Sequence, residues 1–293
     1  MSWSLYRWTW QLESPLYVGM PPAGSVNRCR LYVPARAVWG AVTAEFARAA
    51  AEENFPDYQN KGKELSEHAR FTYLFPAEQD GENWRAWLPR YVQDEGLVWH
   101  REDNAEKKIS DRQLRMRLLS TRPATAIEPS SNTAAEGSLR ETECINTFWR
   151  GNGQDRGTAV GFVGYVFVSS ALSRELSGKL EQLTWVAVGG DARYGLGRLR
   201  RMKWQDADAV FGHQVNLGNT NPSVEAAYVL GHAEASKELC GNLELLRGWD
   251  YDKSDHWRTE IPLWVPGSAS GAVCPWRIDA FGHWSLSNCD VTR

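Results

Sequence analysis

The chain has 293 residues, of which 42% are hydrophobic and 12% aromatic, so one large domain or two smaller ones could bury a sizeable core. The net charge of −3 hides an asymmetry, because residues 1–204 carry 27 basic against 24 acidic side chains and residues 205–293 carry 6 against 12. Five cysteines without a Cys-x-x-Cys pair exclude a disulfide framework and a zinc site, and neither a signal peptide nor a membrane span is recognisable. We therefore expect a reduced, cytoplasmic protein without a metal, a cofactor or a membrane partner.

The first ninety residues alternate between strand-like and helix-like patterns. The pattern predicts, in order, a strand over Leu5–Val18, a turn-rich loop over Gly19–Asn27, a helix over Pro34–Glu53, a polar linker over Asn54–His68, and short strands at Phe71–Phe75 and Trp84–Leu88. The helix is the clearest of these elements, because apolar residues recur at steps of three and four and a proline suits its first turn.

The segment Trp99–Arg122 differs from its surroundings in charge. Between positions 107 and 122 it holds one acid, Asp111, and six cations, which are Lys107, Lys108, Arg112, Arg115, Arg117 and Arg122. Such a segment is either a solvated charged face or an arm that binds nucleic acid. Its high charge and few apolar residues suggest that it gains order only from a partner.

The next eighty residues return to regular patterns. Small polar residues fill Thr125–Gly137, and strands are predicted at Ser138–Phe148, Gly161–Val168 and Leu199–Trp204, with an amphipathic helix at Ala171–Leu183. The order strand, helix, strands, strand, helix, strand predicts an α+β fold of the ferredoxin-like βαββαβ plan used by RRM domains. We expect this core to span residues 1–204, with a thumb-like insertion at about 96–137. A turn-rich extension over 205–293 would form a second, degenerate RRM-like unit or a lid.

A glycine loop precedes the last of these strands. It contains Gly189, Gly190, Gly195 and Gly197, and the basic residues in and after it are Arg193, Arg198, Arg200, Arg201 and Lys203. A P-loop is excluded because no Gly-Lys-Ser/Thr is present, and a dinucleotide-binding loop is excluded because a helix precedes the glycines and a strand follows. Glycines that admit a close backbone approach, surrounded by cations, favour a polyanion over the alternative of a hairpin with a basic face.

Three stretches, in this order, resemble the RAMP superfamily of CRISPR-associated proteins. The first is Ser14–Gly19 followed by Tyr32–Ala41, similar to the family's first strand, loop and helix start. The second is Arg122–Glu128 through Thr133–Leu139, which resembles the segment after the protruding thumb, and the third is the glycine loop. Gly248, Trp249 and the stretch Trp264–Ser268 are similar to the closing segment of the RAMP subunits that cap the 5′ end of the guide RNA.

The resemblance implies a non-catalytic subunit of a type III CRISPR effector complex that binds guide RNA, as a cap more than as a repeated backbone subunit. The implied RNA contacts are Arg36 at the first helix, the six cations at 107–122, the four loop glycines, and Arg193, Arg198 and Arg200. Implied partners are other RAMP subunits, the large subunit and, indirectly, target RNA. The family's target-cleaving subunits carry an aspartate after the first strand, whereas Gly19–Asn27 contains no acid. The resemblance therefore implies no target cleavage.

Two alternatives remain open from the sequence. RAMP endoribonucleases that process guide precursors often use a histidine near the first helix, and His68 is the one histidine near the N-terminal helix here. The other alternative is an interaction scaffold whose glycine loop contacts protein instead of RNA.

Overall fold

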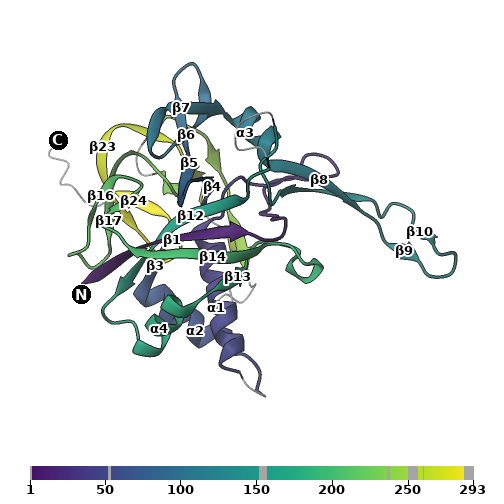
Figure 1. The fold of residues 1–293 in the computed structure, drawn as a ribbon, viewed down its shortest axis with the longest axis horizontal. Coiled ribbons are helices and arrows are strands. Elements are labelled where there is room, and N and C mark those ends of the chain that lie inside the picture. Colours follow the sequence, from purple (N-terminus) through teal and green to yellow (C-terminus); the bar gives the residue numbers. More distant parts are fainter. Residues whose placement is uncertain are drawn as a thin grey trace.

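The computed structural model of the protein describes residues 2–51, 54–151, 157–235, 238–249, 257–259 and 261–286. The larger of its two main sheets forms the body of the protein (Figure 1). Within these residues the sheet has nine strands in the order β13-β14-β1-β12-β4-β5-β6-β7, with β3 also paired to β12. The strands are β1 (Trp3–Leu12), β3 (Ala69–Phe71), β4 (Phe75–Asp80), β5 (Asn83–Val92), β6 (Gly96–Arg101), β7 (Asn104–Ser110), β12 (Val160–Ser169), β13 (Trp185–Ala187) and β14 (Arg198–Asp206). The central strand β1 runs antiparallel to both β12 and β14. The predicted α+β class is confirmed.

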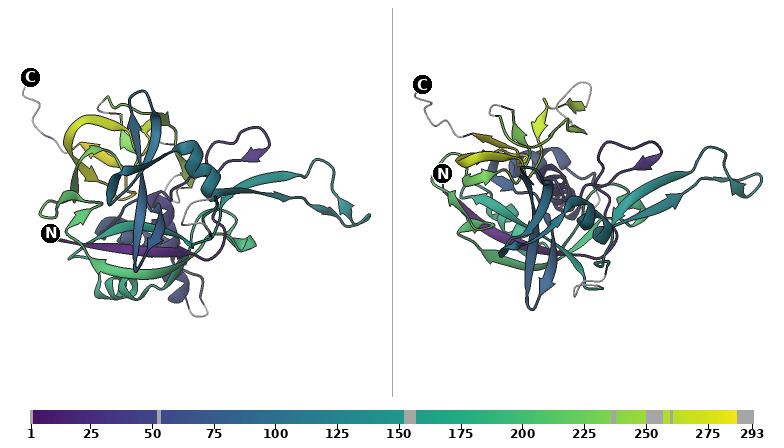
Figure 2. Two further views of the ribbon diagram at one scale, coloured as in Figure 1. Left: turned by 45° about the horizontal axis from the view of Figure 1, so that its top comes forward. Right: turned by 90° about the horizontal axis from the view of Figure 1, so that it is seen from above.

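Three helices lie together on one side of this sheet (Figures 1 and 2). They are α1 (Ala35–Ala49), α2 (Tyr58–His68) and α4 (Arg174–Gln182). The prediction of a polar linker over Asn54–His68 is wrong, because most of that segment forms α2. Asp57 caps this helix by accepting a hydrogen bond from the Asn60 backbone N–H at 3.0 Å. Only Gly62 and Leu65 of α2 are buried, so the apolar periodicity that would reveal the helix in the sequence is nearly absent.

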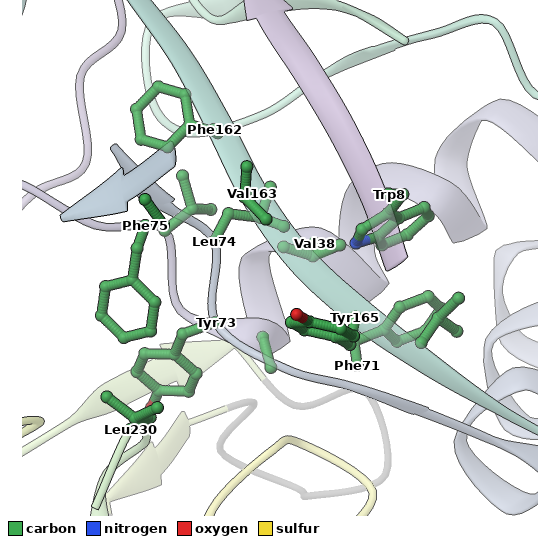
Figure 3. Close-up of a cluster of buried hydrophobic side chains, with 14 of the residues drawn as sticks. Trp8, Val38, Phe71, Tyr73, Leu74, Phe75, Phe162, Val163, Tyr165 and Leu230 are labelled. Atoms are coloured by element: carbon green, nitrogen blue, oxygen red, sulfur yellow. The ribbon is translucent and has the colours of Figure 1, made fainter. Parts of the chain in front are cut away.

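The core lies between the sheet and these helices, and all ten residues of β12 are buried. Trp8 of β1 stacks on Phe71 at 5.6 Å between ring centroids, beside Val38 of α1 (Figure 3). Glycine at position 164 of β12 is required by this packing. A β-carbon there would lie 2.6 Å from a methyl of Leu74 and 2.8 Å from the Tyr73 carbonyl oxygen.

We expect Gly164→Ala to lower the free energy of unfolding by about 1–3 kcal/mol. The added methyl would overpack the core, and the backbone carbonyl of Tyr73 that it meets cannot move aside as a flexible side chain could. Chemical denaturation measures this change. The matched control is Gly178→Ala in α4, where nothing lies within 4 Å of the added methyl. The control should gain about 0.5–1 kcal/mol from helix propensity, and equal losses in both variants would contradict the packing argument.

A long arm leaves the body at one end of the sheet (Figures 1 and 2). Its base is a three-stranded sheet of β2 (Val26–Asn27), β11 (Arg140–Ile145) and β8 (Leu119–Ala124), and its tip is the hairpin of β9 (Ile127–Glu128) and β10 (Thr133–Ala134). The short helix α3 (Asp111–Leu118) joins β7 to the arm and begins with a Ser110–Gln113 capping box.

The segment expected to form one thumb-like insertion, at about 96–137, belongs to two different parts of the structure. Its first part supplies β6 and β7 to the main sheet, and the arm extends from Leu119 to Ile145. The expectation that Trp99–Arg122 has little apolar surface to bury is wrong, because Trp99, Leu114 and Leu118 are all buried in the common core. Those three side chains anchor the charged segment.

The C-terminal part forms a second sheet without helices among its described residues. Its eight strands have the order β15-β16-β17-β23-β24-β18-β22-β19. They are β15 (Ala209–Val210), β16 (His213–Asn216), β17 (Ser223–Tyr228), β18 (Ala233–Glu234), β19 (Leu243–Glu244), β22 (Leu263–Trp264), β23 (Ala269–Ile278) and β24 (Trp284–Leu286), and a separate pair joins β20 (Arg247–Trp249) to β21 (Trp257–Thr259). Trp276 and Trp284 belong to the same buried cluster as Trp8, so the two parts of the chain share one core. No helix among the described residues has the length and apolar character needed to span a membrane.

A buried polar chain connects the two parts. Both carboxylate oxygens of Glu244 accept hydrogen bonds from Arg30 at 3.0 Å, and Glu244 also bonds to Nε2 of His232. Nδ1 of the same ring lies 2.6 Å from the Tyr73 hydroxyl. Burial raises the pKa of Glu244, but the hydrogen bond from His232 and the charge of Arg30 more than offset this and hold the pKa below its usual value. Burial lowers the pKa of His232, against the opposing effect of Glu244. Both groups therefore resist protonation in the folded state.

Acid should weaken this connection. Because both folded-state pKa values are depressed, the unfolded chain takes up protons before the folded protein does. The free energy of unfolding therefore starts to fall once pH drops below the ordinary, unfolded-state pKa, which is about 6.5 for His232 and about 4.3 for Glu244. We expect Glu244→Gln to cost about 3 kcal/mol at pH 7, since Arg30 would remain buried without a counter-charge. The difference between wild type and variant should narrow as pH falls through the folded-state pKa of Glu244. Urea unfolding of both proteins over a range of pH measures this difference in stability, and Glu234→Gln at an exposed position is the control. A difference that does not change with pH would contradict the role assigned to Glu244.

Candidate nucleic-acid interface

The glycine loop joins β13 to β14 and packs against the chain segment that follows β1. Gly190 donates its N–H to the Tyr17 carbonyl at 2.9 Å, and Gly197 donates to the Pro15 carbonyl at 2.8 Å. Gly189 has φ +87°, and a β-carbon there would lie 2.3 Å from the Tyr17 carbonyl oxygen. At Gly197 (φ +79°) a β-carbon would lie 1.9 Å from the Val188 carbonyl oxygen. These three glycines therefore serve close packing within the protein.

Gly195 differs from the other three loop glycines. It has φ +81° and ends the short 3-10 helix η1 (Ala192–Tyr194), but no atom lies within 4 Å of the position that its β-carbon would occupy. Asp191 begins this helix in the left-handed region with φ 58°. The open side of the loop thus lies around Gly195, next to the exposed Arg193 and Tyr194.

Arginine side chains in and near the loop stack on aromatic rings. The Arg193 guanidinium lies 5.0 Å from the Tyr194 ring centroid, and Arg140 of the arm lies 5.4 Å from the same ring. Arg198 lies 5.2 Å from the ring of Trp185 on β13. Tyr194 and Trp185 are 60% and 40% exposed, which is high for aromatic side chains. Cations over exposed aromatic rings are the groups with which proteins bind single-stranded nucleic acids.

Nearby acids compensate part of this positive charge. Glu13, which directly follows β1, forms ion pairs with Arg198 at 3.0 Å and with Arg200 at 2.8 Å. Asp191 lies 3.8 Å from Arg140. All these pairs are at least partly exposed, so their net contribution to stability is small and the cations can exchange partners.

A cleft of about 720 Å³ separates the glycine loop from the base of the arm. It is lined by Thr121, Arg122, Pro123, Ala124, Thr125, Ala126, Ser138, Arg140, Thr142 and Cys144 of the arm and by Asp191, Tyr194 and Leu196 of the loop. The structure thus places Arg122, from one of the two basic regions of the sequence, across a cleft from Tyr194 of the glycine loop. Cys144 is buried, and burial raises the pKa of its thiol, so this thiol stays protonated at neutral pH.

The other cations predicted to bind RNA lie elsewhere. Lys107 and Lys108 are on β7, at the opposite end of the sheet from β13 and β14, where they pair with Glu78 and Glu95. Arg115 pairs with Asp111 at 2.7 Å, and Arg117 lies over Trp149 at 4.8 Å. Arg112 is exposed on α3, and Arg36 lies at the start of α1 beside a different cleft. The predicted set therefore does not form one continuous surface.

Two residues at this cleft, Arg140 and Tyr194, were not among the RNA contacts predicted from the sequence. Arg140 lies in the predicted strand Ser138–Phe148, and Tyr194 lies among the loop glycines, but nothing in the sequence indicated that they meet. Their contact depends on the pairing of β11 with β8 and with β2. An aromatic residue among glycines and arginines was the one available signal.

The histidine considered for ribonuclease activity lies away from this cleft. His68 ends α2 on the helical side of the sheet, and its Nε2 is 4.0 Å from a carboxylate oxygen of Glu67. In the part of the chain that the structure describes, no group of three or more His, Cys, Asp or Glu residues could hold a metal ion.

Comparison with solved structures identifies the fold. A chain in the cryo-EM structure of the Type III-B Cmr-beta bound to cognate target RNA and AMPPnP (state 1) matches with a TM-score of 0.52 at 12% identity, over 90% of this chain and 84% of that chain. Chains of Type III-B Cmr-beta bound to cognate target RNA and in its apo state match with TM-scores of 0.42 and 0.41, at 11% and 10% identity, over 68% and 69% of this chain and 96% and 97% of those chains. No family model and no curated protein matches the sequence. The resemblance to CRISPR type III subunits is thus confirmed at the level of the fold.

The loop glycines can be separated by substitution. We expect Gly189→Ala to cost about 2–4 kcal/mol of unfolding free energy, because the methyl meets a backbone oxygen and the residue must keep a positive φ. Gly195→Ala should cost about 1–2 kcal/mol, from the positive φ alone. Denaturant unfolding of both variants measures the difference, and equal costs would show that the contact with Tyr17 does not constrain the loop.

Proposed function

We propose that this chain is a non-catalytic subunit of a type III CRISPR effector complex that binds guide RNA and takes part in antiviral defence. The observation that carries the proposal is the cleft between arm and glycine loop, which Arg122, Arg140 and Tyr194 line and where Arg140 and Arg193 lie over the exposed ring of Tyr194. Arginine holds phosphate through its planar fork of donors, and an exposed aromatic ring stacks on bases of any identity. An extended single strand matches both requirements.

The strand order supports a modified ferredoxin-like, RRM-type core. Strands β14, β1, β12 and β4 lie side by side with antiparallel pairing, α1 and α2 connect β1 to β3, and α4 connects β12 to β13. This order corresponds to the βαββαβ plan, with the arm inserted between its second and third strands. The likeness to a Type III-B Cmr-beta chain agrees with such a core.

The proposal extends to partners and position. Other RAMP subunits and the large subunit of the complex would lie along the same RNA, and target RNA would approach through the guide. We favour the position that caps the 5′ end of the guide. In its support, Gly248, Trp249 and the stretch Trp264–Ser268 are similar to the closing segment of the subunits that cap the guide. The loop at Gly19–Asn27 has no carboxylate, which supports a subunit that does not cut target RNA.

We expect the double variant Arg140→Gln/Arg193→Gln to bind single-stranded RNA more weakly. The slope of log affinity against log salt should fall by roughly 0.7 for each phosphate that the variant no longer binds, with little dependence on sequence because phosphates carry no base information. Fluorescence anisotropy over a salt series measures both, with Lys63→Gln on the exposed side of α2 as a single charge-removing control and melting temperature as the folding check. Unchanged affinity and slope in a folded double variant would refute the interface.

A further inference from the structure

The main sheet has two edge strands, β13 and β7, at its opposite ends (Figure 1). An edge strand exposes main-chain N–H and C=O groups along its outer side, and these groups can pair with a strand from another chain. Proteins commonly prevent such pairing with charged side chains, and β7 carries Lys107 and Lys108. Strand β13 consists of Trp185, Val186 and Ala187, without a charged side chain or a proline. The two edges of one sheet therefore differ in how well they are protected.

The pairing of β13 with β14 shows which main-chain groups of β13 point outward. Thr184 and Val188, on either side of β13, form main-chain hydrogen bonds of 2.7 and 2.9 Å to β14 and to the end of the glycine loop. Hydrogen-bonded pairs alternate along antiparallel strands, so Val186 also bonds toward β14, and the N–H and C=O groups of Trp185 and Ala187 point to the outer side. Among the described residues, none of these outward groups has a main-chain hydrogen-bond partner.

The side chains beside this edge indicate what kind of strand fits it. Arg200 of β14 lies directly opposite Trp185, which is 40% exposed, and Arg198 lies opposite Ala187. Directly opposed residues share one face of a sheet, so this face presents an aromatic ring, a small side chain and two cations. Both arginine side chains are more than half exposed, and they share Glu13 as an ion-pair partner. An apolar side chain against the ring, next to carboxylates, complements this surface.

We propose that β13 accepts an extended, acidic segment of a partner protein as an additional strand of the main sheet. Main-chain hydrogen bonds to Trp185 and Ala187 hold the segment, as in other cases of strand addition to a sheet edge. A strand of three residues supplies few such bonds, so the contact with Trp185 and ion pairs with Arg198 and Arg200 provide the rest. This strand site is separate from the cleft between arm and glycine loop, since none of the three residues of β13 lines that cleft.

Hydrogen exchange tests this site when the chain alone is compared with the chain purified together with its partners from its native host. We expect the amides of Trp185 and Ala187 to exchange at least about tenfold more slowly with the partners bound. The amide of Val188 is the internal control, because its hydrogen bond within the sheet should keep it slow in both samples. Unchanged exchange at Trp185 and Ala187, or a chain that purifies without a protein partner, would overturn the proposal. Protection that rises with the concentration of the chain alone would identify the occupant as a second copy and would also overturn it.

Ala187→Pro provides an independent variant, because it removes one outward N–H. An edge strand admits proline where the missing N–H faces outward, so the melting temperature should stay near that of wild type. The amount of partner protein retained per chain, measured by quantitative mass spectrometry, should fall by about tenfold. The control Ala187→Ser keeps the N–H and should retain the partner. Equal retention by the two folded variants would overturn the proposal.

The same variant separates this site from the proposed guide-RNA interface. Ala187→Pro should bind single-stranded RNA with the affinity of wild type, because β13 does not line the cleft between arm and glycine loop. Loss of the protein partner with RNA affinity intact supports strand addition at β13. Loss of RNA affinity in a folded Ala187→Pro variant would place RNA at this edge instead of a protein strand, and would overturn the proposal while leaving the guide-RNA interface in place.

Discussion

A short extended segment, Pro15–Tyr17, holds both walls of the cleft between arm and glycine loop. On one side its carbonyl groups accept hydrogen bonds from Gly190 and Gly197 of the loop. On the other side Leu16 exchanges hydrogen bonds of 3.0 and 2.8 Å with Ile145 at the base of the arm. The loop and the arm have no such backbone connection to each other among the described residues. One piece of chain therefore joins the backbones of loop and arm, and Gly189 and Gly190 are required because a side chain at either position would meet Tyr17.

Charge is distributed so that one end of the main sheet keeps more accessible cations than the other. At the β7 end, buried Glu78 lies within 4.0 Å of Arg101, Lys107 and Arg117, so one carboxylate organises three cations. At the arm and loop the cations stack on exposed rings, and their acids are partly exposed. Both regions are rich in basic residues in the sequence. Only the position of the acids distinguishes a neutralised structural cluster from a surface that can bind phosphate.

The sequence predicted the elements whose burial is one-sided or complete. Helix α1, the fully buried β12 and the strand β14 follow directly from apolar periodicity, and their order gave the α+β class. Helix α2 was missed because it buries only Gly62 and Leu65, and the C-terminal sheet was missed because most of its strands are too short to show alternation. The glycine loop was located correctly, but the partner of its backbone, Tyr17, is distant in the chain and could not be inferred. Arg140 and Tyr194 remained unrecognised for the same reason.

Ultraviolet cross-linking of the chain to the RNA that co-purifies with it from its native host, followed by mass spectrometry of the cross-linked peptides, tests the central claim most directly. The account predicts RNA of uniform length, together with other type III subunits, and cross-links at Tyr194 or on the arm strands β8 and β11. Cross-links confined to the β7 end of the sheet, or a chain that purifies with its partners but without RNA, would contradict it.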